Sequence, residues 1–397
     1  AGQADVLYHN RGDGTFEDVT EGMGILRPEG RAMGVSAADY DDDGYVDIYV
    51  ANDAMENFLF HNEKGQRFQE LALPAGVAYN HAGDATSSMA VDFADYDGDG
   101  LMDLFVSDMS YSALYRNEGY GLFRDVTYMA GIAVASGQYV GWASAFIDYD
   151  NDGDLDVYVN NYGPNVLYRN NGNGTFTDVT EKAGVAAGHQ VGAGTNFLDI
   201  DKDGDLDLFV ANYVKFFFDD DRVFKHFTGR PVYPGPNDYS PTPDILYRNN
   251  GDGTFTDISE ESGIGAQAGT GMGTVCADYD NDGDTDIIVA NDMLGNFLYE
   301  NDGTGKFEEA ALFAGIAYDL GGSPQGSMGV VCADYDNDGW LDVHMTSYQR
   351  QLTTLYRNLG DGFLEDATRL SGAGAGTVPE VTWGNGLVDF DNDGDRD

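Results

Sequence analysis

Residues 278–286, Asp-Tyr-Asp-Asn-Asp-Gly-Asp-Thr-Asp, carry the pattern that decides the fold of this chain. The pattern Asp-x-Asp-x-Asp-Gly-x-x-Asp occurs seven times, and its copies begin at Asp39, Asp95, Asp148, Asp199, Asp278, Asp334 and Asp389. Neighbouring copies are 51 to 56 residues apart, except for one spacing of 79 residues. Self-similarity at such a period indicates a repeat architecture rather than several unrelated domains.

A second pattern alternates with the first, also in seven copies. Its full form is Leu-Tyr-x-Asn-x-Gly-x-Gly-x-Phe-x-Asp-x-Thr, and the copies begin at Leu7, Leu59, Leu114, Leu167, Leu246, Leu298 and Leu355. An Asn/Gly turn between two aromatic-rich segments is typical of a β-hairpin. Apolar segments before and after each Asp loop, such as 34–38 and 46–50, predict two further strands. Four antiparallel strands per repeat predict the blade of a β-propeller.

The order of the two patterns predicts how the propeller closes. The chain opens with a hairpin pattern and ends with an Asp loop, so strands within 4–20 and the segment 381–397 together should form the seventh blade. We therefore predict an all-β fold: residues 1–397 as one seven-bladed β-propeller of four-stranded antiparallel blades. A strand like 46–50 follows every other Asp loop, so we expect the natural chain to continue beyond Asp397 or that strand to come from elsewhere.

The long spacing marks an insertion at residues 213–243 in blade four. It is rich in aromatic residues and proline, which disfavour both a helix interior and a central strand. We expect an ordered loop over one face of that blade.

The Asp loops are predicted calcium sites. Carboxylate oxygens at alternate positions around a tight Gly turn suit a hard cation, and a flexible, mostly protein-ligated cage favours calcium over magnesium. An EF-hand is excluded because its twelfth position is a Glu, whereas here that position is Val or Met within a strand. We predict about seven structural calcium ions, with side-chain ligands at positions 1, 3, 5 and 9 and a backbone carbonyl at position 7. The expected ligands are Asp39, Asp41, Asp43, Tyr45 and Asp47; Asp95, Asp97, Asp99, Leu101 and Asp103; Asp148, Asp150, Asp152, Asp154 and Asp156; Asp199, Asp201, Asp203, Asp205 and Asp207; Asp278, Asp280, Asp282, Asp284 and Asp286; Asp334, Asp336, Asp338, Trp340 and Asp342; and Asp389, Asp391, Asp393, Asp395 and Asp397.

The net charge of the chain restricts the kinds of molecule that it is expected to bind. The chain has 20 Lys and Arg against 69 Asp and Glu, a net charge of −49. Nucleic acid is an unsuitable partner because no basic patch is present to neutralise phosphates, and an anionic membrane surface is unsuitable for the same reason. The sequence contains no run of 18 apolar residues, so it predicts no membrane-spanning helix. We expect an extracellular or periplasmic protein, since millimolar calcium outside cells keeps even weak sites filled.

The two motifs together resemble a known family. The segments DYDNDGDTDIIVAND from Asp278 and LYRNNGNGTFTDVTEKAGV from Leu167 resemble the FG-GAP/VCBS repeats of integrin α-subunit propellers and, more closely, the cartilage acidic protein 1 family and its microbial homologues. The resemblance covers nearly the whole chain. It is specific for the fold and much less so for function, because propellers serve in binding, as lectins and as lyases.

We therefore expect a non-enzymatic module for adhesion, binding or assembly, with a protein or glycan ligand and no assigned catalytic or cofactor-binding residue. One alternative is a lectin or polysaccharide lyase, in which His226 and Tyr233, near Lys225, Arg230 and Tyr239 of the insertion, are the catalytic candidates. Another is an extracellular polymer, in which the seventh blade accepts a strand from a neighbour.

Two smaller signals bear on packing and binding. A bulky residue recurs six positions before every Asp loop except the fourth, which has Ala193. It packs either between blades or around the mouth of a central channel, where Trp142 and Trp383 could stack on a sugar. Cys276 and Cys332 occupy equivalent positions in adjacent repeats, which predicts buried free thiols rather than a disulfide.

Overall fold

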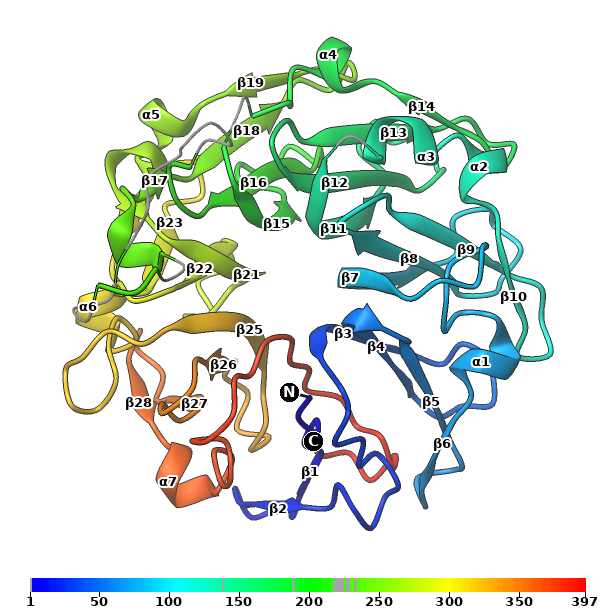
Figure 1. The fold of residues 1–397 in the computed structure, drawn as a ribbon. Helices are drawn as coiled ribbons and strands as arrows, with labels where there is room; N and C mark the ends of the chain where they lie inside the picture. The colour runs from blue at the N-terminus through cyan, green and yellow to red at the C-terminus, as the bar shows by residue number, and fades with distance from the viewer. Residues whose placement is uncertain (1, 138, 188–189, 217–224, 226–228, 232–233) are drawn as a thin grey trace.

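The computed structural model describes residues 2–397 except 138, 188–189, 217–224, 226–228 and 232–233. Four-stranded antiparallel blades are arranged radially around an axis (Figure 1), as the repeat predicted. Six blades are complete, and β4 and β7 join the first two of them into one larger sheet. The fold is a seven-bladed β-propeller whose last blade combines the two ends of the chain.

The elements follow one order in each repeat. Blades one to three are β3 (Ala32–Ala38), β4 (Asp47–Met55), β5 (Phe58–Asn62) and β6 (Phe68–Glu70); β7 (Thr86–Ala94), β8 (Asp103–Asp108), β9 (Ala113–Asn117) and β10 (Phe123–Asp125); and β11 (Val140–Ile147), β12 (Asp156–Tyr162), β13 (Val166–Asn170) and β14 (Phe176–Asp178). Blades four to six are β15 (Gly192–Leu198), β16 (Asp207–Asn212), β18 (Ile245–Asn249) and β19 (Phe255–Asp257); β21 (Gly271–Ala277), β22 (Asp286–Asn291), β23 (Phe297–Asn301) and β24 (Phe307–Glu309); and β25 (Ser327–Ala333), β26 (Asp342–Ser347), β27 (Thr354–Asn358) and β28 (Leu364–Asp366). The seventh blade contains β1 (Tyr8–Asn10) and β2 (Phe16–Asp18), and a short pair, β17 (Thr242–Pro243) with β20 (Ala268–Gly269), lies beside blade four.

Single-turn helices follow the blades, an element that the sequence did not predict. They are α1 (Ala72–Ala75), α2 (Thr127–Ala130), α3 (Ala133–Ser136), α4 (Thr180–Ala183), α5 (Ser259–Ser262), α6 (Ala311–Ala314) and α7 (Thr368–Ser371), with 3-10 turns η1 (Pro236–Asp238) and η2 (Ile264–Ala266). Most end at a glycine in the left-handed region, such as Gly76 with φ 87°. Four residues are too few to show a helical period in sequence.

The antiparallel order places both motifs on one face of the propeller. In six blades the Asp loop connects the first strand to the second, and the ninth residue of the loop begins the second strand, as Asp156 begins β12. The Asn/Gly turn connects the third strand to the fourth, so it lies at the same end of the blade as the Asp loop. The insertion instead connects β16 to β18 and therefore leaves the blade at the opposite face.

The seventh blade differs from the expected four strands. β1 pairs only with β2, and residues 381–388, at the position of an innermost strand, form no strand. The amide of Asp397 donates to the carbonyl of Val388 at 3.0 Å, which corresponds to the pairing of Asp47 with Ala38 in blade one.

A ring of asparagine side chains joins every blade to its neighbour. Asn10 Nδ2 donates to Tyr335 O of blade six at 2.8 Å, and Asn62 Nδ2 of blade one donates to Phe390 O of blade seven at 2.7 Å. The same bond crosses the other five interfaces, from Asn117 to Tyr40, Asn170 to Tyr96, Asn249 to Tyr149, Asn301 to Ile200 and Asn358 to Tyr279. The two ends of the chain thus occupy one position in the ring (Figure 1).

The core consists of one hydrophobic cluster at each interface between blades. The cluster between blades six and seven is the smallest, with Tyr335, Leu355 and Ala373 buried in it. Near the axis the innermost strands approach closely, since a Cβ on Gly34 would lie 2.5 Å from Met89 O. The ring centroids of Trp142 and Trp383, from blades three and seven, are 6.5 Å apart, so this pair meets across the axis rather than between neighbouring blades.

Asp244 is a buried acid in a place where three other blades carry an asparagine. Its Oδ1 accepts a hydrogen bond from Asn212 N at 2.9 Å, and its Oδ2 is buried with no partner in the described part of the chain. Burial raises the pKa of Asp244 to about 7. The equivalent residues Asn57, Asn165 and Asn296 accept the same bond and also donate one from Nδ2.

We predict that Asp244→Asn stabilises the protein increasingly as pH rises. When the pKa of a carboxyl is higher in the folded state than in the unfolded state, the protein loses stability as pH rises from the unfolded pKa, about 4, to the folded pKa. The asparagine does not ionise, so the gain in free energy of unfolding should be small at pH 4.5 and on the order of 1–2 kcal/mol at pH 8. Urea unfolding at both pH values with calcium held constant measures it. The exposed acid Glu260, changed to Gln, is the control, and an equal effect of the two substitutions would contradict the prediction.

Candidate metal centres

Each Asp loop is bent by its own carboxylates. In the third loop Asp148 Oδ1 accepts a hydrogen bond from Asp152 N at 3.1 Å and Oδ2 accepts one from Gly153 N at 3.0 Å. Asp152 Oδ1 accepts a bond from Asp154 N at 3.0 Å. Asn151, at position 4, and Gly153, at position 6, have φ of 55° and 91°, which explains the Asn, Asp and Gly that recur at these positions.

The ninth residue of the loop connects it to the hairpin of the same blade. Asp156 is buried; its Oδ1 accepts a bond from Asn170 N at 2.7 Å, and its Oδ2 accepts one from Tyr149 N at 3.2 Å. The same pair of bonds recurs in the other loops at Asp47, Asp103, Asp207, Asp286, Asp342 and Asp397. Loop and hairpin, the two motifs of the sequence, therefore form one unit.

The carboxylates of a loop converge, and some of their oxygens have no donor. Ligand atoms of Asp148, Asp150 and Asp156 all lie within 4.8 Å of one another. The third position contributes the oxygens that are buried without a hydrogen-bond partner, namely Oδ1 of Asp41, Asp97, Asp150, Asp201 and Asp336. Buried polar atoms in native proteins are almost always paired. Converging hard oxygens, some of them unpaired, match the donor set that calcium prefers.

Burial and the neighbouring carboxylates also raise the pKa values of the loop aspartates. Burial raises the pKa of Asp103 to about 7, and the charge of Asp97 adds to that rise against the opposing hydrogen bond from the Asn117 amide. Burial likewise raises the pKa of the ninth-position carboxylate to about 7 in the other five complete blades, and the pKa of Asp397 to about 6. A divalent cation among these oxygens favours their ionised form.

Side chains of the hairpin face the loops, and sequence reasoning missed them. They occupy the variable position of Leu-Tyr-x-Asn, which holds a histidine or a charged residue in all seven copies: His9, His61, Arg116, Arg169, Arg248, Glu300 and Arg357. Arg116 Nε lies 2.6 Å from Asp97 Oδ2, and its Nη2 lies 2.9 Å from Asp99 Oδ2. His61 Nδ1 lies 3.1 Å from Asp47 Oδ1. The sequence did contain a signal for these residues, because a polar side chain recurs at this position of a predicted strand.

Neighbouring loops also contact one another. Asn151 Nδ2 donates to Asp205 Oδ1 of the next loop at 2.8 Å, and Asn337 Nδ2 donates to Asp395 Oδ1 at 2.7 Å. The position-7 aspartates Asp205, Asp284 and Asp395 therefore bond through their side chains to the adjacent loop, which leaves their backbone carbonyls as the groups expected to face a cation. The loops that are linked in this way lie beside one another on one face of the propeller.

The remaining sequence candidates are placed as follows. His226 and Tyr233 lie outside the described residues. Tyr239 packs against Phe216 with ring centroids 5.4 Å apart. Cys276 and Cys332 are free thiols, as predicted, but both residues are half-buried rather than fully buried. Across the described ranges, no helix is long and apolar enough to cross a membrane.

The sequence of the chain matches a known repeat family and several known proteins. The model of the FG-GAP-like repeat matches residues 2–50, 39–106, 95–159, 148–210, 235–289, 278–345 and 334–397. Cartilage acidic protein 1 of Mus musculus and that of Homo sapiens are each 26% identical to this chain over 406 residues, which is 91% of the chain and 56% and 54% of those proteins. The chain thus spans about half the length of these relatives.

Solved structures share the fold at low identity. A lectin of Agrocybe aegerita that recognises non-reducing terminal N-acetylglucosamine aligns with a TM-score of 0.57 and 17% identity over 92% of this chain and 89% of its own. YCF48 bound to D1 peptide aligns with a TM-score of 0.51 and 8% identity over 91% of this chain and 86% of its own. These similarities establish the propeller fold alone.

Proposed function

Since this chain belongs to the family of FG-GAP-like repeat proteins, we propose that it is a calcium-binding propeller that binds a protein or glycan ligand outside the cytoplasm. The observation that carries the calcium proposal is the set of buried third-position oxygens without a hydrogen-bond donor, of which Asp150 Oδ1 is one. An unpaired buried carboxylate oxygen is costly unless a cation or donor satisfies it.

The ligands proposed in each loop are the carboxylates at positions 1, 3, 5 and 9 and the carbonyl at position 7. In the third loop these are Asp148, Asp150, Asp152 and Asp156 with the Asp154 carbonyl. The ion would stabilise the connection between the first two strands of a blade, so calcium is proposed as structural.

The charge of the variable residue of Leu-Tyr-x-Asn, which faces the loop, should make the calcium affinity differ from loop to loop. Glu300 accepts a hydrogen bond from Tyr279, next to the loop that begins at Asp278, and adds a negative charge there. Arg116 and Arg357 instead place a guanidinium against the third-position carboxylates of their loops. Coulomb's law therefore ranks the Asp278 loop above the Asp95 and Asp334 loops in calcium affinity.

A binding role is proposed in preference to catalysis. Propellers similar in fold bind a glycan in one case and a peptide in another, which supports a protein or glycan ligand. The extracellular or periplasmic location is proposed because weak calcium sites fill only where calcium is millimolar.

Metal counting tests the calcium proposal. Protein dialysed against millimolar calcium should retain about seven calcium ions per chain, and equimolar magnesium should not displace them. Glu300→Gln should weaken the tightest step of a calcium titration, whereas the exposed Glu308→Gln should leave it unchanged. Fewer than two ions per chain would overturn the proposal. A glycan array probed in calcium and in chelator then tests whether ligand binding depends on the metal.

A further inference from the structure

The fourth residue of an Asp loop reaches the loop of the next blade. It lies between the proposed ligands at positions 3 and 5, and its side chain crosses the gap between the two blades. Among the described residues, five loops make this contact. The pairs are Asn151 Nδ2 with Asp205 Oδ1 at 2.8 Å, Lys202 Nζ with Asp284 Oδ1, Asn281 Nδ2 with Gly339 O at 3.3 Å, Asn337 Nδ2 with Asp395 Oδ1 at 2.7 Å, and Asn392 Nδ2 with Gly44 O at 2.9 Å.

Every contact ends on position 6 or position 7 of the receiving loop. Three of them reach the side chain of the position-7 aspartate, and two reach the carbonyl of the position-6 glycine, which is bonded to the position-7 amide. The backbone carbonyl of position 7 is the proposed calcium ligand. The segment that carries this ligand is therefore held by a side chain from the neighbouring loop.

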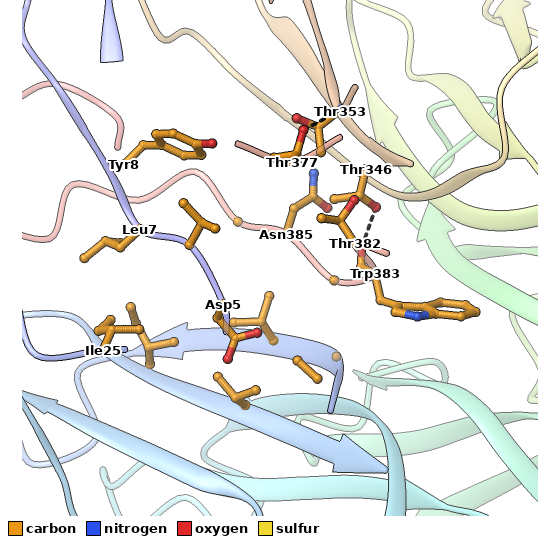
Figure 2. Close-up of a pocket in the computed structure, with 18 of the residues that line it drawn as sticks. Asp5, Leu7, Tyr8, Ile25, Thr346, Thr353, Thr377, Thr382, Trp383 and Asn385 are labelled. Carbon is orange, nitrogen blue, oxygen red and sulfur yellow. Dashed lines mark hydrogen bonds between the residues drawn. The ribbon is translucent and has the colours of Figure 1, made fainter. Parts of the chain in front are cut away.

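The contacts connect six loops into one run, from the third loop to the seventh and on to the first. The last step, from Asn392 to Gly44, crosses the place where the two ends of the chain meet. Figure 2 shows the blade in which they meet, with Leu7 and Tyr8 of the N-terminal segment opposite Asn385 of the C-terminal segment. The seventh and first loops are thus connected although they belong to opposite ends of the chain.

The second loop lies outside this run. The fourth residue of the first loop is Asp42, whose carboxylate has no N–H to donate when it is ionised. The fourth residue of the second loop is Gly98, which has no side chain. Neither residue can therefore make the contact that the other five loops make.

We propose that the position-4 side chain is a positioning residue that couples the calcium sites of neighbouring blades, so that the six connected loops fill cooperatively and the second loop fills independently. This inference rests on the proposed function and describes how the same sites are regulated. Coupling of this kind is a free energy shared between two sites, and it acts equally in both directions.

The coupling arises from the order that each cation imposes. A cation in one loop fixes positions 3 and 5, and therefore also the backbone of the residue between them. The side chain of that residue then holds positions 6 and 7 of the next loop before a second cation arrives. The second cation loses less conformational freedom on binding, so its affinity rises. One hydrogen bond that forms in one state and not in the other changes such an equilibrium by about fivefold.

The fifth and sixth loops are the most informative pair. The loop at Asp278 is ranked above the loop at Asp334 in calcium affinity, and Asn281 connects the two. The fifth loop should therefore fill first and raise the affinity of the sixth. Repulsion between two neighbouring cations would change the affinity in the opposite direction, so a rise distinguishes the coupling from simple electrostatics.

Trp340 makes this coupling measurable at one site. It is the position-7 residue of the sixth loop, so terbium luminescence excited through tryptophan reports on that loop, and competition with calcium gives its calcium affinity. In the full chain, Asn281→Gly should weaken calcium binding to the sixth loop about fivefold, although no proposed ligand of that loop is changed. Asn281 has a φ of 58°, which glycine adopts without strain. The control Asp42→Gly removes a position-4 side chain that makes no such contact and should leave the sixth loop unchanged.

A double-mutant cycle separates coupling from a merely structural role. Asp280→Asn removes a proposed ligand of the fifth loop, so it should lower the metal count by one and weaken the sixth loop by the same factor as Asn281→Gly. Adding Asn281→Gly to that variant should have no further effect, because an empty fifth loop no longer positions the side chain.

Two results would overturn the proposal: an unchanged sixth loop in Asn281→Gly, or effects of the two substitutions that multiply. A count of about seven calcium ions with such a result would refute the coupling alone. Fewer than two ions per chain would refute the proposed function itself.

Discussion

Withdrawing calcium with excess chelator should lower the midpoint of thermal unfolding by on the order of 20 °C. Each site that is filled at about a hundred times its dissociation constant contributes about 2.7 kcal/mol to stability. Several such sites together exceed the whole stability of an ordinary domain, about 5–15 kcal/mol. The chain also has a net charge of −49, so the loops repel one another once the cations leave.

Differential scanning calorimetry in calcium, in chelator and after restoring calcium measures this effect. Recovery of the original midpoint on restoring calcium separates metal loss from irreversible damage. Magnesium added in place of calcium should recover only part of the midpoint, because magnesium requires octahedral geometry and keeps its waters. An unchanged midpoint in chelator would mean that the Asp loops are solvated turns and that the calcium proposal is wrong.

Asp156→Ala should destabilise the protein by about 3–5 kcal/mol in saturating calcium and remove one ion from the metal count. The substitution deletes a proposed ligand and leaves the amides of Asn170 and Tyr149 without the carboxylate that accepts from both. Each buried donor left unpaired costs about 1–3 kcal/mol. Urea unfolding with metal counting on the same samples measures both quantities.

Asp154→Ala in the same loop is the matched control. It removes a carboxylate of the same charge from position 7, where other loops carry Tyr45, Leu101 or Trp340. Because its carbonyl is the proposed ligand, the variant should keep the full metal count and change the free energy of unfolding by less than about 1 kcal/mol. Equal effects at Asp154 and Asp156 would show that only total charge matters, and the ligand assignment would fail.

Much of the fold followed from two short motifs. The alternation of Asp loops and Asn/Gly turns predicted strands, blades and their number, because turn chemistry and period-two patterns are local properties. The single-turn helices were missed because four residues show no period. The seventh blade was predicted with strand structure in 381–397, but 381–388 forms no strand, since a strand exists only through its pairing with a neighbour.

The candidate site was predicted only in part. Its aspartates were named from the spacing alone, and the structure brings several of them together, Asp148 with Asp150 and Asp156 for example. The facing residues, such as Arg116 and His61, were not found, because each belongs to the hairpin motif and reaches the loop only after the blade has formed.

By itself, the sequence determined which residues repeat and therefore the blade, the loop and the type of donor atom, because each depends on neighbours within about ten positions. The tertiary structure decided which oxygens remain without donors and how the ring closes. Asn62 bonds to Phe390, 328 residues away, and Asn10 bonds to Arg396, 386 residues away. Such contacts form only when the first and last repeats meet, and no local pattern specifies which atoms that meeting satisfies and which it leaves unpaired.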